Sequence, residues 1–352
     1  MKFVDAEATR GHDPAAEIWV GVRIQGTEVA ERAEVIRKSL LAGGHQAVAP
    51  ISVSTADLVT VHDLELVDFL REAWSDWEQS SYPEEPGQDR VVPYVFPLAG
   101  VTSGRPPRRP ASVAARAGVF CMDTMTLIGP GTWEAVEAAA ACALTAADLV
   151  AQGDRFVYAL SRPPGHHAGR SYYGGSCYLN NAALAASRLA RGVGGVVAVI
   201  DLDAHHGNGT QEIFYQRSDI RYGSVHIDPG AGYFPHFLGF ADETGSGEGA
   251  GANLNLPLPP RVGDEQWLGA VQRLLDFASG VDALVVSLGV DAWRNDPESP
   301  LLVTEEGFAA AGRLVGALSL PTVVIQEGGY DLAALGPLVA TFLKGMEDAT
   351  QS

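Results

Sequence analysis

The stretch VVAVIDLDAHHGNG, residues 196–209, is the most informative part of this sequence for its fold. An apolar run ends at Asp201, and Asp203, His205 and His206 follow within five residues. A continuous apolar run is typical of a strand buried on both faces, in a parallel sheet covered by helices. In such folds ligands bind where loops leave the carboxyl ends of the strands. The stretch therefore predicts an α/β fold with polar chemistry at one edge of its sheet.

Similar short apolar runs recur along the chain and alternate with helical patterns, which predicts βαβ units around a parallel sheet. The expected strands are residues 155–160, 195–202, 224–227, 283–289 and 322–325. The expected helices are residues 132–152, 178–189, 265–278 and 305–318. Residues 80–118 are irregular and rich in proline, glycine and arginine, but no second set of apolar segments precedes them. We expect a single domain, residues 1–352, with an inserted surface or oligomer-contact loop at about 80–118.

The composition excludes several classes of protein. The chain has 352 residues, with 24 Lys+Arg against 43 Asp+Glu and a formal charge of −19, so a nucleic-acid partner is not expected. A charged start and apolar runs far below the length of a membrane span predict no signal peptide and no membrane segment. Cys121, Cys142 and Cys177 are too widely spaced for a disulfide framework, which favours a cytoplasmic location.

Four loops after predicted strands deliver polar side chains to one sheet edge. They are SRPPGHHAG (161–169), DLDAHHGNG (201–209), GVDAWRNDP (289–297) and QEGGYDL (326–332). Each alone is a weak signal, but their convergence indicates a site. Asp203, His205 and Asp291 would give a metal three protein ligands and leave coordination open, as in catalytic zinc sites. The same ligands also admit Fe(II), Co(II) or Mn(II).

These motifs resemble the histone deacetylase and acetylpolyamine amidohydrolase family. The similarity covers nearly the whole domain through HDPAAE, RPPGHHAG, GGSCYLNNA, DLDAHHGNGTQEIF, SVHIDPG, FADETGSGEG, LNLPLP, GVDAWRNDP and QEGGY. The resemblance implies the three-layer αβα arginase-deacetylase fold with a central, mostly parallel eight-stranded sheet. It also implies a zinc-dependent amidohydrolase that removes an acetyl or related acyl group from an amine.

The resemblance also implies roles for matching residues. His167 would be the general base and then the general acid, His166 would be held by Asp201, and Tyr330 would donate a hydrogen bond to the oxyanion. Asn208 would contact His167 where first-class histone deacetylases carry an aspartate. The zinc ligands would be Asp203, His205 and Asp291. A structural K⁺ would be held at Asp201, Asp203, His205, Ser224 and Val225.

Substrate contacts follow from the same resemblance. The backbone of Gly175 and the ring of Phe234 would line the substrate tunnel, and Ser176 replaces a usual aromatic wall residue. Glu17 and Asp123 would attract a cationic amine at the rim. An acetylpolyamine, acetyl-lysine or an N-acyl small molecule would be the substrate, and bacterial relatives suggest a homodimer.

Two other functions share some of these features. An arginase-like binuclear ureohydrolase needs further carboxylates two residues past His205 and Asp291, where Gly207 and Trp293 stand. A non-catalytic acyl-binding scaffold would be expected to lose part of the catalytic set, yet all of it is present. The remaining histidines are interpreted as structural: His12, His45, His62, His206, His226 and His236.

Overall fold

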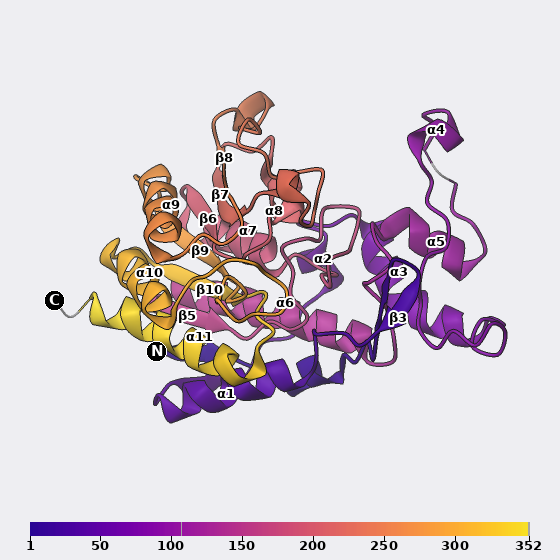
Figure 1. The fold of residues 1–352 in the computed structure, drawn as a ribbon, viewed down its shortest axis with the longest axis horizontal. Helices are drawn as coiled ribbons and strands as arrows, with labels where there is room; N and C mark the ends of the chain where they lie inside the picture. The colour runs from indigo at the N-terminus through magenta and orange to yellow at the C-terminus, as the bar shows by residue number, and fades with distance from the viewer. Residues whose placement is uncertain (107, 351–352) are drawn as a thin grey trace.

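The structure is a computed structural model and describes residues 1–106 and 108–350. Its centre is a sheet of eight parallel strands in the order β4-β1-β5-β10-β9-β6-β7-β8 (Figure 1). The strands are β1 (Lys2–Val4), β4 (Gln46–Val48), β5 (Phe156–Ala159), β6 (Val197–Asp201), β7 (Ile220–Ile227), β8 (Asn253–Leu258), β9 (Ala283–Leu288) and β10 (Thr322–Gln326). The predicted eight-stranded sheet is confirmed, and it is wholly parallel.

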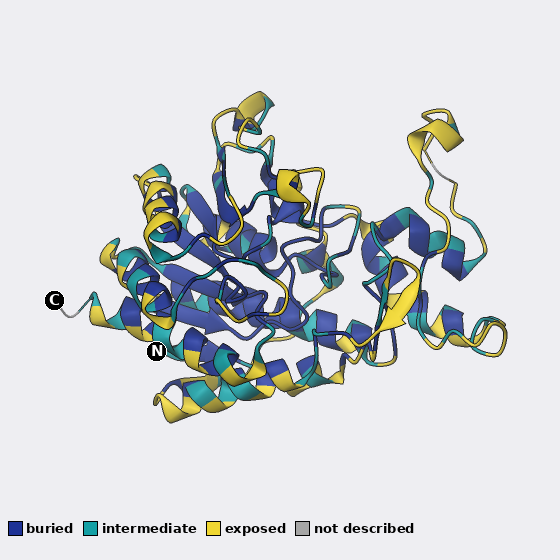
Figure 2. Ribbon diagram, in the orientation of Figure 1, coloured by how far each residue is buried: buried dark blue, intermediate teal, exposed yellow. Residues whose placement is uncertain are grey.

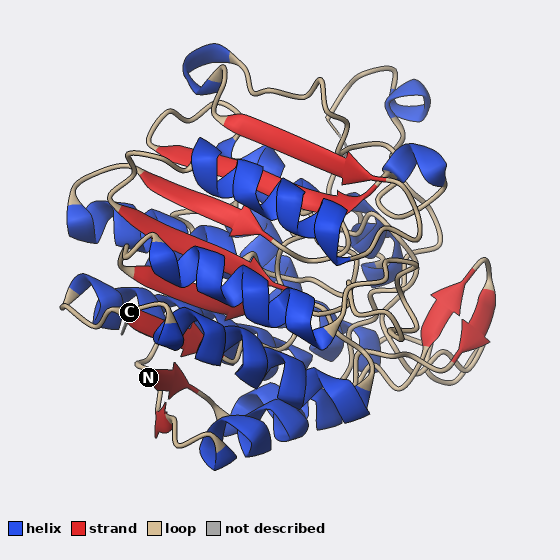
Figure 3. Ribbon diagram, turned by 60° about the vertical axis from the view of Figure 1, so that its left-hand side comes forward, coloured by secondary structure: helices blue, strands red, loops and turns tan. Residues whose placement is uncertain are grey.

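Helices cover both faces of this sheet and complete the three predicted layers (Figure 3). The helices are α1 (Glu31–Ala42), α2 (Thr55–Leu58), α3 (Leu64–Glu78), α4 (Ala99–Thr102), α5 (Val113–Phe120), α6 (Thr132–Ala151), α7 (Asn181–Val193), α8 (Asn208–Phe214), α9 (Asp264–Phe277), α10 (Glu305–Ala317) and α11 (Leu332–Asp348). Among the described residues, no helix is long and apolar enough to cross a membrane.

Alternate side chains of each central strand pack into two different hydrophobic cores, one on each face of the sheet. In β6, Val197 and Val199 pack with α6 and α7, whereas Ala198 and Ile200 pack with α9. Because both faces are covered, both sets of side chains are apolar, which explains the continuous apolar run in the sequence. Figure 2 shows the sheet as the most buried part of the molecule.

The predicted insertion is only partly a surface loop. The short helix α4 stands at the end of an exposed arm (Figures 1 and 2). Pro107 of the predicted insertion lies outside the described residues, as do residues 351–352 of the expected domain. Residues 113–118 differ from the prediction, because they begin α5 and bury Val113 and Ala117 in the core beside α3. An antiparallel hairpin of β2 (Glu17–Trp19) and β3 (Val22–Ile24) lies outside the main sheet.

Candidate active site

The four predicted loops meet at the carboxyl end of the sheet. They follow β5, β6, β9 and β10, and these strands are neighbours in the order β5-β10-β9-β6. Parallel neighbours place their carboxyl ends at one edge, so residues distant in sequence come together there. The four loops thus converge at one sheet edge as expected, and the use of this edge as an active site stays a prediction.

Asp203, His205 and Asp291 form a compact cluster with possible ligand atoms within 4.8 Å of one another. The Nδ1 of His205 lies 3.0 Å from Asp291 Oδ2, and the backbone N–H of Gly328 donates to Asp203 Oδ2 at 2.8 Å. Glycines make room for the carboxylates, because a Cβ on Gly289 would lie 2.0 Å from Asp203 Oδ2.

The charge of this cluster fits a divalent cation. Burial and the neighbouring carboxylate of Asp203 raise the pKa of Asp291 to about 7. Two adjacent buried carboxylates repel each other, and a bound cation offsets that repulsion. One imidazole and two carboxylates also make the kind of ligand set that zinc takes in catalytic sites.

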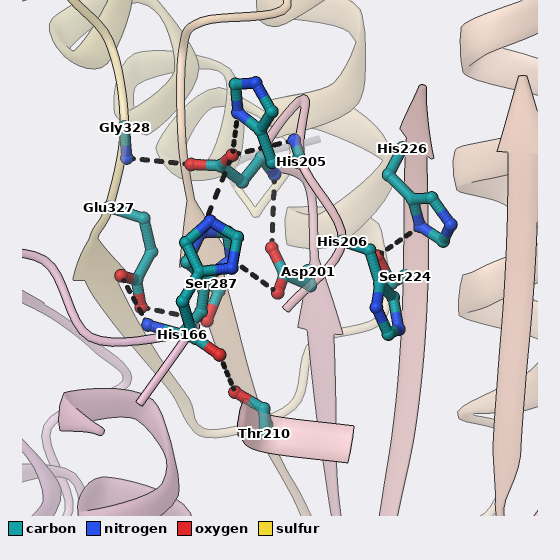
Figure 4. Close-up of polar contacts among 12 residues, drawn as sticks. His166, Asp201, His205, His206, Thr210, Ser224, His226, Ser287, Glu327 and Gly328 are labelled. Carbon is teal, nitrogen blue, oxygen red and sulfur yellow. Dashed lines mark hydrogen bonds and ion pairs between the residues drawn. The ribbon is translucent and has the colours of Figure 1, made fainter. Parts of the chain in front are cut away.

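His166 is held between acidic groups (Figure 4). Its Nδ1 lies 3.1 Å from Asp201 Oδ2, and this oxygen also accepts a hydrogen bond from Tyr222 at 3.0 Å. Burial opposes the charged imidazolium, but Asp203 and Asp201 outweigh it and raise the pKa of His166 to about 10. Glu327, which the sequence reasoning missed, accepts the backbone N–H groups of Gly165 and His166 at 2.7 and 3.2 Å. This side chain fixes the tandem-histidine loop.

His167 is arranged as a neutral imidazole. Its Nδ1 lies 2.7 Å from Asn208 Oδ1, and because an amide oxygen can only accept, Nδ1 carries the proton and Nε2 keeps its lone pair. Burial, followed by the charges of His166 and His205, lowers the pKa of His167 well below its usual value. The predicted contact between Asn208 and His167 is present.

A cavity of about 440 Å³ reaches the rings of His167 and His205, which form part of its lining. Its lining includes these predicted residues: Glu17, His167, Gly175, His205, Phe234 and Tyr330. Gly175 has φ +58°, and a Cβ there would lie 2.4 Å from the ring of His167. The ring of Phe234 meets that of His167 edge to face, with centroids 4.7 Å apart.

Asp123 lies beside the cavity wall and is absent from its lining. Its carboxylate accepts the backbone N–H groups of Gly175 at 2.6 Å, Met125 at 2.8 Å and Thr126 at 2.9 Å. In this arrangement Asp123 positions the Gly175 loop, and a direct contact with substrate stays a prediction.

Two further residues of the site, besides Glu327, were missed. Glu298 lines the cavity with Glu17, whose pKa is raised to about 7 by burial and then by Glu298. Arg32 is buried, donates to the carbonyls of Gly329 at 2.7 Å and Glu327 at 2.6 Å, and lies 4.8 Å from the ring centroid of Tyr330. Neither belongs to a local motif that signals its place.

The remaining histidines mostly fit the structural interpretation. His206 is buried, with Nε2 3.1 Å from Gln211 Oε1, and burial lowers the pKa of His12, His62 and His226 to about 4. His236 differs from the prediction in its position, because the loop after β7 brings it into the cavity lining.

The positions that an arginase-like second metal would need offer no further ligand. A Cβ on Gly207 would lie only 2.3 Å from Asp201 Oδ2, and the indole N–H of Trp293 donates to Asp331 Oδ2 at 3.1 Å. A binuclear site is therefore not supported at these two positions.

Comparisons with known proteins identify the family of this chain. The histone deacetylase domain family matches residues 26–346. The acetylpolyamine amidohydrolase of Mycoplana ramosa is 38% identical over 351 residues, which are 98% of this chain and 99% of the relative. That of Burkholderia pseudomallei (strain 1710b) is 40% identical over 338 residues, 95% of each chain. A crystal structure of acetylpolyamine aminohydrolase from Burkholderia pseudomallei superposes with a TM-score of 0.93 at 38% identity and covers 99% of both chains. This chain therefore belongs to the histone deacetylase family.

Proposed function

We propose that this protein is a zinc-dependent amidohydrolase that removes an acetyl group from a small cationic amine such as an acetylpolyamine. The observation that carries the proposal is one cavity whose lining includes His205 of the metal-binding triad, the neutral His167 and the carboxylates of Glu17 and Glu298. The names of the relatives, acetylpolyamine amidohydrolase, support the same substrate class.

Asp203, His205 and Asp291 would hold the zinc ion. When bound there, zinc supplies Lewis acidity toward the amide carbonyl and toward the attacking water. The same ligands admit Fe(II) or Co(II), so metal content belongs among the properties to be measured.

The protein's own groups would move the protons. His167 Nε2 takes a proton from the attacking water and later gives it to the leaving amine, a role that needs the neutral imidazole described above. His166, paired with Asp201, stays positively charged and stabilises developing negative charge. Tyr330 donates a hydrogen bond from its hydroxyl to the oxyanion, since burial raises the pKa of Tyr330 well above its usual value and keeps the hydroxyl protonated.

The carboxylates of Glu17 and the exposed Glu298, which line the cavity, favour a substrate with a distant ammonium group. Carboxylates that line a cavity raise the local concentration of cations. An acetylpolyamine keeps at least one free ammonium group, whereas an acetylated lysine side chain carries no charge, so these carboxylates would favour the acetylpolyamine.

The proposal is tested with zinc-loaded protein on N-acetylated polyamines, acetyl-lysine peptides and longer acyl amides. We expect kcat/KM for an acetylpolyamine to exceed that for the peptide by more than about tenfold. Chelation of the metal should abolish turnover, and readdition of zinc should restore it. Turnover that survives complete metal removal would contradict the proposal.

Binding of a cationic substrate should depend on the charge of Glu17. Its pKa of about 7 means that this carboxyl is neutral at lower pH and ionised above, so KM for an acetylated diamine should fall between pH 6 and pH 8. We expect a change of roughly three- to tenfold, since a partly exposed ion pair contributes about 1 kcal/mol. Steady-state kinetics with a neutral acetylated alkylamine of equal length, and with Glu17→Gln, provide the controls. An identical pH dependence of KM in Glu17→Gln would rule out this role.

The substitution Asn208→Asp should change the pH profile through His167. A carboxylate at the position of the amide, 2.7 Å from Nδ1, would stabilise the imidazolium and raise the pKa of His167. Because His167 must be neutral to act as a base, the acidic limb of kcat/KM should move to higher pH. The profile is measured against wild type, and an unchanged acidic limb would remove the proposed contact from the mechanism.

Three further expectations stay proposals. A structural K⁺ at the Asp201 to His205 segment is supported by its neighbour β7, where Ser224 pairs in register with Asp201. A homodimer through the N-terminal segment or residues 80–118 is supported by exposed apolar side chains on the α4 arm, among them Leu98 and Val101. A cytoplasmic location is supported by three buried, unpaired cysteines.

A further inference from the structure

One buried carboxylate, that of Asp296, is hydrogen-bonded to both loops that carry Tyr330 and Glu298. Its Oδ2 accepts the backbone N–H of Tyr330 at 2.7 Å and that of Asp331 at 3.3 Å. Its Oδ1 accepts the backbone N–H of Glu298 at 3.0 Å. Asp296 is only 7% exposed, and it does not line the cavity that Tyr330 and Glu298 line.

A carboxylate suits this place because every group facing it in these contacts is a backbone N–H donor. An ionised carboxylate accepts at both oxygens and donates nothing, whereas an amide would turn an N–H toward one of these donors. The same two loops are also joined where Trp293 donates to the Asp331 side chain at 3.1 Å and where the Val290 N–H donates to the Gly328 carbonyl at 3.2 Å. These contacts touch neither Tyr330 nor Glu298, and among the described residues Asp296 is the one side chain that accepts the backbone N–H groups of both.

We propose that Asp296 is a positioning residue that sets the Tyr330 hydroxyl and the Glu298 carboxylate in place together. The inference rests on the proposed function, because it assigns Tyr330 to the oxyanion and Glu298 to the cationic end of the substrate. Movement of the Tyr330 backbone would weaken a contact made in the transition state and lower kcat for every substrate. Movement of the Glu298 backbone would raise KM for cationic substrates only.

The test compares Asp296→Asn with a matched control, Asp264→Asn. Asp264 is also a carboxylate that accepts a backbone N–H, that of Thr304 at 2.8 Å, and it lies outside the cavity lining. Both zinc-loaded variants are measured with an acetylated diamine and with a neutral acetylated alkylamine of equal length. For Asp296→Asn we expect kcat to fall about tenfold or more with both substrates. KM should rise severalfold with the diamine alone, and Asp264→Asn should change only the thermal midpoint.

A double-mutant cycle separates positioning from general loss of structure. If Asp296 acts through the Tyr330 hydroxyl, Asp296→Asn should lower kcat less than about twofold in a Tyr330→Phe background. The inference would be overturned if the kcat losses of the two single substitutions multiplied in full in the double variant. It would also be overturned if Asp296→Asn raised KM equally for the two substrates. Should Asp296→Asn fail to fold, Asp296→Ser keeps one acceptor oxygen and is judged by the same two outcomes.

The design also distinguishes this inference from the proposed function. A wild-type enzyme that hydrolyses neither amide would overturn both. If the wild-type enzyme hydrolyses the amides but the kcat losses of Asp296→Asn and Tyr330→Phe multiply in full, only the role of Asp296 would be overturned.

Discussion

Replacing His167 with alanine is expected to lower kcat for amide hydrolysis by about 10²- to 10⁴-fold, the usual contribution of a positioned general base and acid. The imidazole faces the cavity with an unprotonated Nε2, because Asn208 accepts from Nδ1 at 2.7 Å. Burial and two neighbouring histidines keep the pKa of His167 low, so the ring is ready to accept a proton. Steady-state kinetics on an acetylated diamine should show the loss in kcat with little change in KM.

A buried histidine outside the cavity provides the control for this substitution. His62 Nδ1 lies 2.9 Å from the carbonyl of Gly169, and its Nε2 accepts the N–H of Asn180 at 2.9 Å. His62→Gln should lower the thermal midpoint and leave kcat within about threefold of wild type, because structural substitutions act mainly on stability. A folded, metal-loaded His167→Ala protein with wild-type kcat would refute the assignment of the base.

The sheet and the site loops could be predicted because their signals are local. Strands such as β9 and β10 are buried on both faces and therefore read as apolar runs, and each ends directly before the loop that carries Asp291 or Tyr330. Strands β1, β4 and β8 escaped prediction. Strands β1 and β4 have only three residues each, at or near one sheet edge, which leaves too few apolar residues for a pattern, and the edge strand β8 (NLNLPL) interrupts its apolar residues with asparagine and proline.

The missed site residues depend on contacts that no local pattern contains. Arg32 lies on α1 among charged neighbours and looks like a solvent-exposed residue, yet its partners Glu327 and Gly329 are about 300 positions away in sequence. Glu298 follows Asp291 in a loop whose path back to the cavity depends on Asp296. Such residues become visible only when the loops around the sheet edge are placed relative to one another.

Replacing Tyr330 with phenylalanine is expected to lower kcat by about 10²- to 10³-fold, the usual cost of removing one donor to an oxyanion. The ring should keep its place, because the Arg32 guanidinium lies 4.8 Å from its centroid and Asp296 holds the backbone N–H at 2.7 Å. Only the hydroxyl is lost, so the ground state should bind nearly as before. Pre-steady-state and steady-state kinetics should therefore place the defect in the chemical step, with KM within about threefold of wild type.

The matched control for this prediction is Tyr233→Phe, because Tyr233 also lines the cavity but comes from the loop after β7, with Phe234 next to it. Removing a hydroxyl there changes the polarity of the wall and leaves the proposed oxyanion donor in place. If catalysis depends on where negative charge develops, Tyr330→Phe should lose far more kcat than Tyr233→Phe on the same acetylated diamine. Equal losses in the two variants would mean that wall polarity controls turnover, and the oxyanion role of Tyr330 would then be wrong.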